Sequence, residues 1–154
     1  MEKTNELNKF LSYIHMGTSV FRIYYDQAKK LDDDKLVNLV VEIMEIFKTH
    51  EENITKLINS FGEEATNSLT AAGIMGLYKE KLKIFDDGFD ICFSAIKSTN
   101  MGMISSLKFL KQNKELHDNV KAYIVDVIRD YERITDKLTN YVLNLLYQDI
   151  NNIN

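Results

Sequence analysis

The residues in this sequence that are best able to do chemistry are three histidines and the carboxylates close to them. His50 interrupts a run of apolar residues that recur at three- and four-residue steps, so it belongs to the buried face of a helix. Together with Glu51 and Glu132 it could form a metal or redox site, because imidazole and carboxylate groups are common metal ligands. The alternatives are a histidine that senses pH or faces a partner and, the interpretation we favour, a structural histidine that donates to a buried acceptor.

The other candidates for chemistry lack the neighbours that a site needs. His15 and His117 have no carboxylate or histidine at helical ligand spacing, so we expect both at the surface or at its boundary. Cys92 is the single cysteine, which indicates a packed structural thiol and a reducing compartment. No complete catalytic or ligand-binding motif is present, and we therefore expect neither an enzyme nor a cofactor.

The composition is that of an ordinary globular domain. The 154 residues are 45% hydrophobic and 27% charged, with a net charge of −4, no proline and six glycines. This length suits one domain, residues 1–154, and the lack of proline favours long helices. Mild acidity argues against nucleic acid as a partner, and the lack of any run of about 18 apolar residues argues against membrane insertion. The charged N-terminus does not resemble a signal peptide, so we expect a cytoplasmic protein.

Apolar periodicity predicts an all-α protein with four long helices. We expect these helices over residues 4–31, 34–61, 89–111 and 115–147. Asp33 is the best N-cap for the second helix, and Gly62 follows that helix as a C-terminal stop. The connection over residues 62–88 should contain a shorter helix, 68–85, that either crosses the bundle or caps one end. The asparagine-rich tail, 148–154, is expected to fray.

The two halves of the chain resemble each other. His15-Met16-Gly17 matches Asn100-Met101-Gly102, and Thr49-His50-Glu51 resembles Asp130-Tyr131-Glu132. Any two amphipathic hairpins share some similarity, but the order of these matches favours a true internal repeat.

The repeat has consequences for packing and topology. It divides the chain into a first hairpin, 4–61, and a second hairpin, 89–147. His50 and Tyr131 become equivalent positions, and we expect them to share a buried polar contact across the bundle. A connection as long as residues 62–88 can cross the bundle, which lets the third long helix run parallel to the second.

This hairpin–crossover–hairpin order resembles the ferritin-like superfamily, and in particular small bacterial relatives of rubrerythrin. The resemblance also depends on a histidine late in the second helix that is followed by Leu57-Ile58 and Phe61-Gly62-Glu63. It implies a ferritin-like four-helix bundle with a crossover between the second and third long helices. It also implies a two-iron site, held by a glutamate from each of two helices and a Glu-x-x-His pair from each of the other two.

The iron ligands that the resemblance implies do not carry over to this sequence. The Glu-x-x-His of the second helix corresponds to Phe47-Lys48-Thr49-His50, and that of the fourth to Ile128-Arg129-Asp130-Tyr131. The two single glutamates fall near Gly17 and Gly102, where no carboxylate stands. Glu51 and Glu132 are each one residue off the apolar face, so we expect them to face solvent or the flank of the bundle. The metal site is therefore interpreted as lost.

The sequence predicts a metal-free, non-catalytic bundle that acts through protein contacts, as a homo-oligomer or with another protein. Tyrosines that are exposed along one face would indicate such an interface. One alternative is a residual metal-binding or redox protein that uses His50, Glu51 and Glu132. The other is a small-molecule carrier with its ligand in the space left by Gly17 and Gly102, which otherwise serve close packing.

Overall fold

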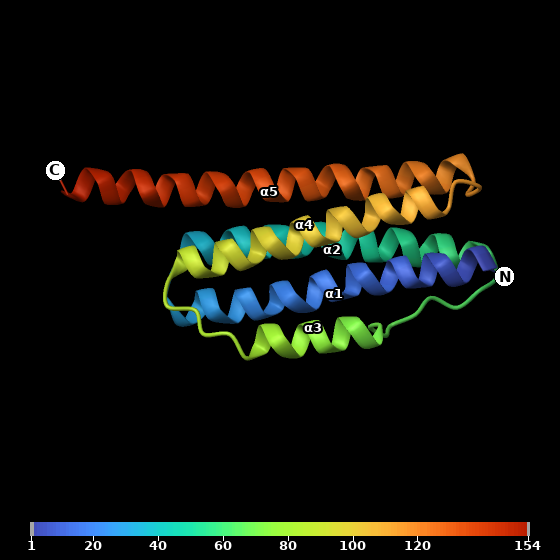
Figure 1. Cartoon of the computed structure of the whole chain (residues 1–154), viewed down its shortest axis with the longest axis horizontal. Helices are drawn as coiled ribbons and strands as arrows, with labels where there is room; N and C mark the ends of the chain where they lie inside the picture. The colour runs from blue at the N-terminus through green and yellow to red at the C-terminus, as the bar shows by residue number, and fades with distance from the viewer. Residues whose placement is uncertain (1, 154) are drawn as a thin grey trace.

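The computed structural model describes residues 2–153, with side chains described for residues 5–148, and over this range it is all-α. The five helices are α1 (Glu2–Lys30), α2 (Asp34–Ser60), α3 (Ala71–Lys81), α4 (Gly88–Gln112) and α5 (Asp118–Ile153) (Figure 1). Four of them are long, and α3 is the short helix that was expected in the connection between α2 and α4.

The four long helices surround one core. α1 packs against α2 and α4, while α5 packs against α4 and α2, so the contacts close a ring. α3 lies outside this ring and packs on α1. Figure 1 shows that the connection from α2 returns along the length of the molecule, that α3 runs parallel to α1, and that α4 runs in the same direction as α2. The segment that contains α3 therefore crosses the bundle and does not cap one end.

Short polar signals fix the helix ends, as the sequence predicts. The Asp33 side chain accepts a hydrogen bond of 3.0 Å from the backbone nitrogen of Leu36, which makes it the N-cap of α2. After α2, Gly62 takes a positive φ of 78°, the left-handed conformation that commonly ends a helix. The turn between α1 and α2 uses a positive φ at Asp32, which lets so short a connection reverse the chain.

The largest errors in the expected boundaries are at α3 and at the end of α5. α3 runs from Ala71 to Lys81 and not from residue 68 to 85; the Thr70 side chain accepts from the backbone nitrogen of Gly73 and caps its start. α5 continues to Ile153, beyond the expected end at residue 147, and projects past the other helices in Figure 1. No glycine or proline follows Asp118 that could end the helix sooner. Asn154 lies outside the described residues.

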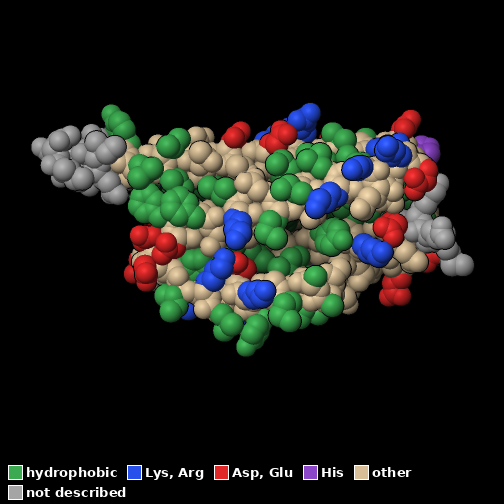
Figure 2. All heavy atoms as spheres, in the orientation of Figure 1, with side chains coloured by type: hydrophobic (Ala, Val, Ile, Leu, Met, Phe, Trp, Pro, Cys, Tyr) green, Lys and Arg blue, Asp and Glu red, His purple; other side chains and the backbone are tan. Residues whose placement is uncertain are grey.

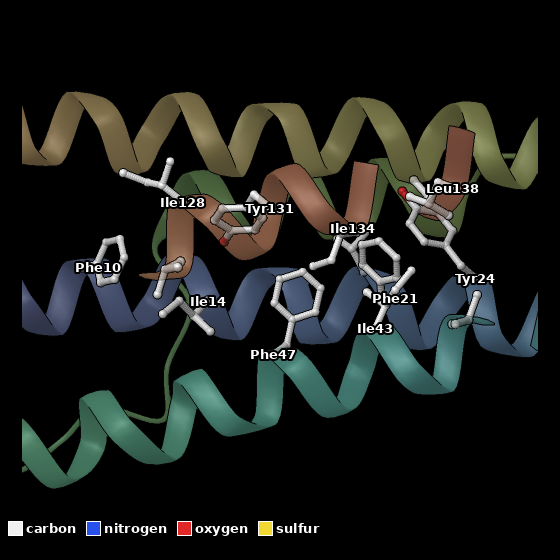
Figure 3. Packing of buried hydrophobic residues seen from close by; sticks show 14 of the residues in the cluster. Phe10, Ile14, Phe21, Tyr24, Ile43, Phe47, Ile128, Tyr131, Ile134 and Leu138 are labelled. Atoms are coloured by element: carbon white, nitrogen blue, oxygen red, sulfur yellow. The ribbon is translucent and has the colours of Figure 1, made fainter. Parts of the chain in front are cut away.

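Aromatic and branched side chains fill the middle of the ring (Figure 3). The Phe47 ring centroid lies 5.2 Å from that of Phe21 and 5.9 Å from that of Tyr131, so rings from α1, α2 and α5 meet at one level. Each large side chain buried in this way stabilises the fold by about 1.5–3 kcal/mol. The same contacts fix the rotation of each helix, and hence which polar residues face one another outside the core.

Candidate functional site

The middle of the bundle, where the resemblance would place an iron site, is apolar. Phe47 is 2% exposed and Ile128 is 6% exposed, so both positions lie inside. Gly17 and Gly102 each face an aromatic ring: a Cβ atom at Gly17 would lie 3.0 Å from Cε1 of Phe47, and one at Gly102 would lie 2.9 Å from Cζ of Tyr131. These residues offer no anionic oxygen, so this level does not fit a pair of iron ions.

The same contacts leave little room for a ligand beside the glycines. At each glycine an aromatic ring occupies the space that a side chain would need, which is the close packing expected of Gly17 and Gly102. A groove of about 190 Å³ does occur between α1 and α4, where Lys9, Tyr13, Lys108 and Phe109 are among its lining residues. The groove is open to solvent and is lined by both polar and apolar side chains, and no residue in its walls indicates a particular ligand.

His50 makes its polar contact with Asp130 and not with Tyr131. Its Nε2 atom lies 2.7 Å from Oδ2 of Asp130, and His50 itself is 8% exposed. Asp130 also forms an ion pair with Arg133, one turn further along α5. The expected contact with Tyr131 is wrong because the Tyr131 ring turns inward against Gly102 and Phe47, which leaves the preceding residue to face α2.

A second histidine, His15, lies at the centre of a polar cluster between α1, α2 and the connection to α3. Its Nδ1 atom contacts the Glu51 carboxylate, and its Nε2 atom lies 2.8 Å from the carbonyl oxygen of Thr66. Thr18 donates a hydrogen bond to the same carboxylate. Glu51 was expected to face solvent or the flank; it lies on the flank, turned toward α1, and its side chain is only 21% exposed.

The two ring nitrogens of His15 both face acceptors, which favours the doubly protonated imidazolium. A carbonyl oxygen cannot donate, so Nε2 must carry a proton, and an ionised carboxylate requires the same of Nδ1. The hydrogen bond with Glu51 raises the pKa of His15 above its usual value, although burial opposes this. Burial opposes the ionisation of Glu51, but the bonds from His15 and Thr18 outweigh it and lower the pKa of that carboxyl.

The alternative metal ligands His50, Glu51 and Glu132 are not brought together. His50 pairs with Asp130, Glu51 pairs with His15, and Glu132 is an exposed residue whose Oε1 lies 3.0 Å from Arg129. Across the described part of the chain, no group of three His, Cys, Asp or Glu side chains could hold a metal ion. Cys92 is buried, and burial raises the pKa of its thiol to about 12, so the thiol stays protonated and unreactive.

The feature that sequence reasoning missed is the outward face of α3. The residues that turn toward α1 are the small Gly73 and Gly76, the apolar Leu77 and the charged Glu80. The other large apolar residues turn outward, and together with two side chains from the segment after α3 they form what we call the α3 outer face: Ile74, Met75, Tyr78, Leu82 and Ile84. Figure 2 shows hydrophobic side chains along the edge of the molecule where α3 lies. The spacing of Ile74, Met75, Tyr78 and Leu82 follows a helix period and was visible in the sequence.

Specific contacts hold α3 with its outer face toward solvent. The Tyr24 hydroxyl donates to Oε2 of Glu80 over 2.9 Å and lies 2.8 Å from Oγ of Ser98, so it joins α1, α3 and α4. On α1, the terminal methyl carbon of Met16 lies 3.1 Å from the position that a Cβ atom on Gly76 would take. The connection before α3 is held as well, since Ser12 donates to the Ser68 carbonyl over 2.8 Å.

Comparisons with known proteins do not assign this chain. No protein-family model matches it, and a search of curated proteins finds no significant match. In the described residues, none of the helices has both the length and the apolar character needed to cross a membrane.

Proposed function

We propose that this protein is a non-catalytic helical bundle that acts through protein–protein contacts made by the α3 outer face. The observation that carries the proposal is the orientation of α3, which packs Gly76, Leu77 and Glu80 toward α1 and leaves most of its large apolar residues toward solvent. Ile74, Met75, Tyr78 and Leu82 are between 57% and 64% exposed. A helix that is apolar on both sides is ordinarily covered on both sides, and exposed apolar patches of this kind mark interaction sites.

The polar residues of the protein support a structural role more than a chemical one. His50 and His15 each pair with a carboxylate on a neighbouring helix, and among the described residues neither belongs to a group of three potential metal ligands. The core beside Gly17 and Gly102 is filled by rings. We also propose a reducing compartment such as the cytoplasm, because the single cysteine is buried and has no disulfide partner.

The proposal includes a ferritin-like architecture that arose by duplication of a hairpin. It is supported by the parallel course of α2 and α4 and by equivalent contacts in the two hairpins. Gly17 faces Phe47 in one hairpin as Gly102 faces Tyr131 in the other. In addition, the His15–Glu51 contact corresponds to the one between Thr135 and Asn100, whose side-chain oxygens lie 3.4 Å apart. In this alignment Tyr131 is equivalent to Phe47, one turn away from the equivalence with His50 that the sequence suggests.

Site-specific photo-cross-linking in cells tests the proposed function. A photoreactive phenylalanine analogue replaces Tyr78, in the α3 outer face, or Tyr123, which is 40% exposed on α5 and serves as the matched control. We expect a protein adduct from position 78 and none from position 123. If position 78 gives no protein adduct, or no more than position 123, the α3 outer face is not a protein-contact site and the proposal is wrong.

A further inference from the structure

We propose that the occupant of the α3 outer face is a second copy of this chain, whose own α3 lies antiparallel to the first. This inference rests on the proposed function and names its partner. In a two-fold dimer the same patch is used on both subunits, so the patch has to be complementary to itself in shape and charge. The α3 outer face meets both conditions.

The spacing of the exposed residues is that of a helix–helix seam. Ala71, Ile74, Met75, Tyr78 and Leu82 recur at steps of three, one, three and four, which places them on one stripe along α3. All five are exposed. Two such stripes in antiparallel orientation bring the bulky middle of each, at Met75 and Tyr78, against the middle of the other. Side chains at the two ends then pack over the shorter Ala71 of the partner.

The area of the patch is close to what a stable dimer needs. The five side chains of the α3 outer face are between 57% and 85% exposed. At about 200 Å² for a fully exposed side chain of this size, they present roughly 650 Å² of apolar surface. A standard protein interface buries about 800 Å² on each partner, and the polar residues beside the stripe can supply the remainder. On a monomer, an apolar patch this large would be at the upper end of the usual range.

The charges that flank the stripe favour the antiparallel orientation. Glu63 and Glu64 lie before α3, whereas the exposed Lys79 and Lys81 lie at its end, where Lys83 is paired with Glu80. Contacts with α1 show how far apart these groups are: Asn8 donates to the Glu64 carbonyl and Tyr24 donates to Glu80. Because these two α1 residues are 16 positions apart, the acidic and basic ends are separated by roughly 24 Å. An antiparallel pair brings unlike charges together at both ends, and a parallel pair brings like charges together.

The charges around the patch as a whole disfavour a lipid surface as the occupant. Lys79 and Lys81 are outnumbered by four exposed carboxylates that stand beyond the two ends of the patch: Glu63 and Glu64 before α3, and Asp86 and Asp87 after it. The net charge of the chain is −4. An anionic bilayer would repel these carboxylates. A helix that binds a membrane surface usually has basic residues along its polar face, whereas the face of α3 opposite the stripe is docked on α1.

Sedimentation velocity of the full chain over a range of concentrations tests the inference. We expect a reversible monomer–dimer equilibrium. Tyr78→Glu, in the middle of the stripe, should raise the dissociation constant at least tenfold, because it buries a charge in the seam. Val125→Glu is the matched control: Val125 is 41% exposed on α5, away from the patch, and the change should leave the equilibrium unaltered. Circular dichroism establishes that both variants remain folded.

A charge exchange tests the orientation separately. Glu64→Lys alone and Lys81→Glu alone should each weaken the dimer, and the double variant should recover most of the loss. In a parallel pair position 64 faces position 64 and position 81 faces position 81, so either single change keeps like charges opposed and should not weaken the dimer. A chain that stays monomeric, or that dimerises equally well with Tyr78→Glu, overturns the inference.

The proposed function can survive that result. If a monomeric chain still gives adducts with a different protein from position 78, only the self-association is wrong. If it gives no protein adduct and instead sediments with phosphatidylserine vesicles in a manner that depends on Tyr78, both proposals are wrong.

Discussion

Gly17 and Gly102 matter for packing because each lies against an aromatic ring. Each allows an aromatic ring from the neighbouring helix to pass close to the backbone, at Phe47 and at Tyr131. Glycine in a helix interior costs about 1 kcal/mol relative to alanine, so its presence here has to be offset by packing. The rings that replace the missing side chains provide that packing, since they join α1 to α2 and α4 to α5 at the level of the core.

Gly102→Ala should therefore destabilise the protein despite the better helix propensity of alanine. The new Cβ atom would lie 2.9–3.1 Å from Cζ, the hydroxyl oxygen and Cε1 of Tyr131, whose ring is buried and cannot move freely. Overpacking of this kind costs typically 1–3 kcal/mol, so we expect a net loss of about 1 kcal/mol in the free energy of unfolding. Urea denaturation at one protein concentration measures it.

Gly76→Ala is the matched control for that experiment. Its nearest neighbour is the terminal methyl group of Met16, which is at the end of a flexible side chain. We expect Gly76→Ala to leave stability unchanged or to raise it by up to about 1 kcal/mol. A stabilising Gly102→Ala would show that the Tyr131 ring yields easily and that close packing at this level is unimportant.

The His15–Glu51 contact makes stability depend on pH on both sides of a maximum. The pKa of His15 is raised from 6.5, so its contribution is complete below pH 6.5 and is lost as the pH rises through the folded value. The pKa of Glu51 is lowered from 4.5, so its contribution is complete above pH 4.5 and is lost as the pH falls through the folded value. The pair therefore stabilises the fold most between about pH 4.5 and 6.5.

Glu51→Gln isolates this dependence. We expect the stability difference between the original chain and the variant to be about 1.5–3 kcal/mol at pH 5.5 and smaller at pH 8.5, because hydrogen bonds to charged groups are worth this much. Unfolding by urea at the two pH values gives the difference directly. An identical difference at both values would mean that His15 is not charged in the folded protein.

At the scale of the element, α3 is held by few contacts, and Tyr24 provides the central one. None of the residues of α3 is buried, so the helix depends on its contacts with α1 more than on a core of its own. Tyr24→Phe removes the hydroxyl that joins Glu80 to Ser98 while the ring stays in the core. We expect hydrogen exchange to become faster in α3 than in α2 or α5, with a loss of about 1 kcal/mol in overall stability.

Tyr78→Phe is the control for Tyr24→Phe, because it removes the hydroxyl of a tyrosine that is 60% exposed. Its exchange rates in α3 should match those of the unaltered chain. Equal effects of the two changes would show that the hydrogen bonds of Tyr24 do not hold α3 in place.

Helices were easier to predict than the directions in which they face. The seam of α2 and the caps at Asp33 and Gly62 follow from local spacing, and the structure has them where the sequence predicts. α3 was more difficult, since its periodicity separates a side with glycines from a side with large apolar residues but does not show which side meets α1. The end of α5 was misjudged because asparagine content suggested fraying where no residue breaks the helix.

At the scale of the whole molecule, polar pairs across helices could not be predicted from spacing within one helix. His15 and Glu51 are 36 residues apart, and His50 and Asp130 are 80 residues apart. Whether such residues meet depends on the rotation of two helices, and a rotation by one residue exchanges Tyr131 for Asp130 as the partner of His50.

Core positions were predicted well where a helix has one continuous apolar seam, as in α2. Phe47 and Ile128 are inside. Core positions were predicted less well in α4, where Phe93 and Leu107 were expected inside but are 56% and 49% exposed.

The course of the chain through α3 separates the molecule into two pieces that could exist without a covalent link. Residues 82–87 form a short exposed segment, anchored chiefly by the buried Phe85, between α1–α3 on one side and α4–α5 on the other. The two pieces meet where α1 packs against α4 and where α2 packs against α5. A break after Lys83 would cut the chain between α3 and α4 without interrupting a helix. The two fragments, produced separately, should bind each other and restore the fold, as the fragments of a split reporter protein do.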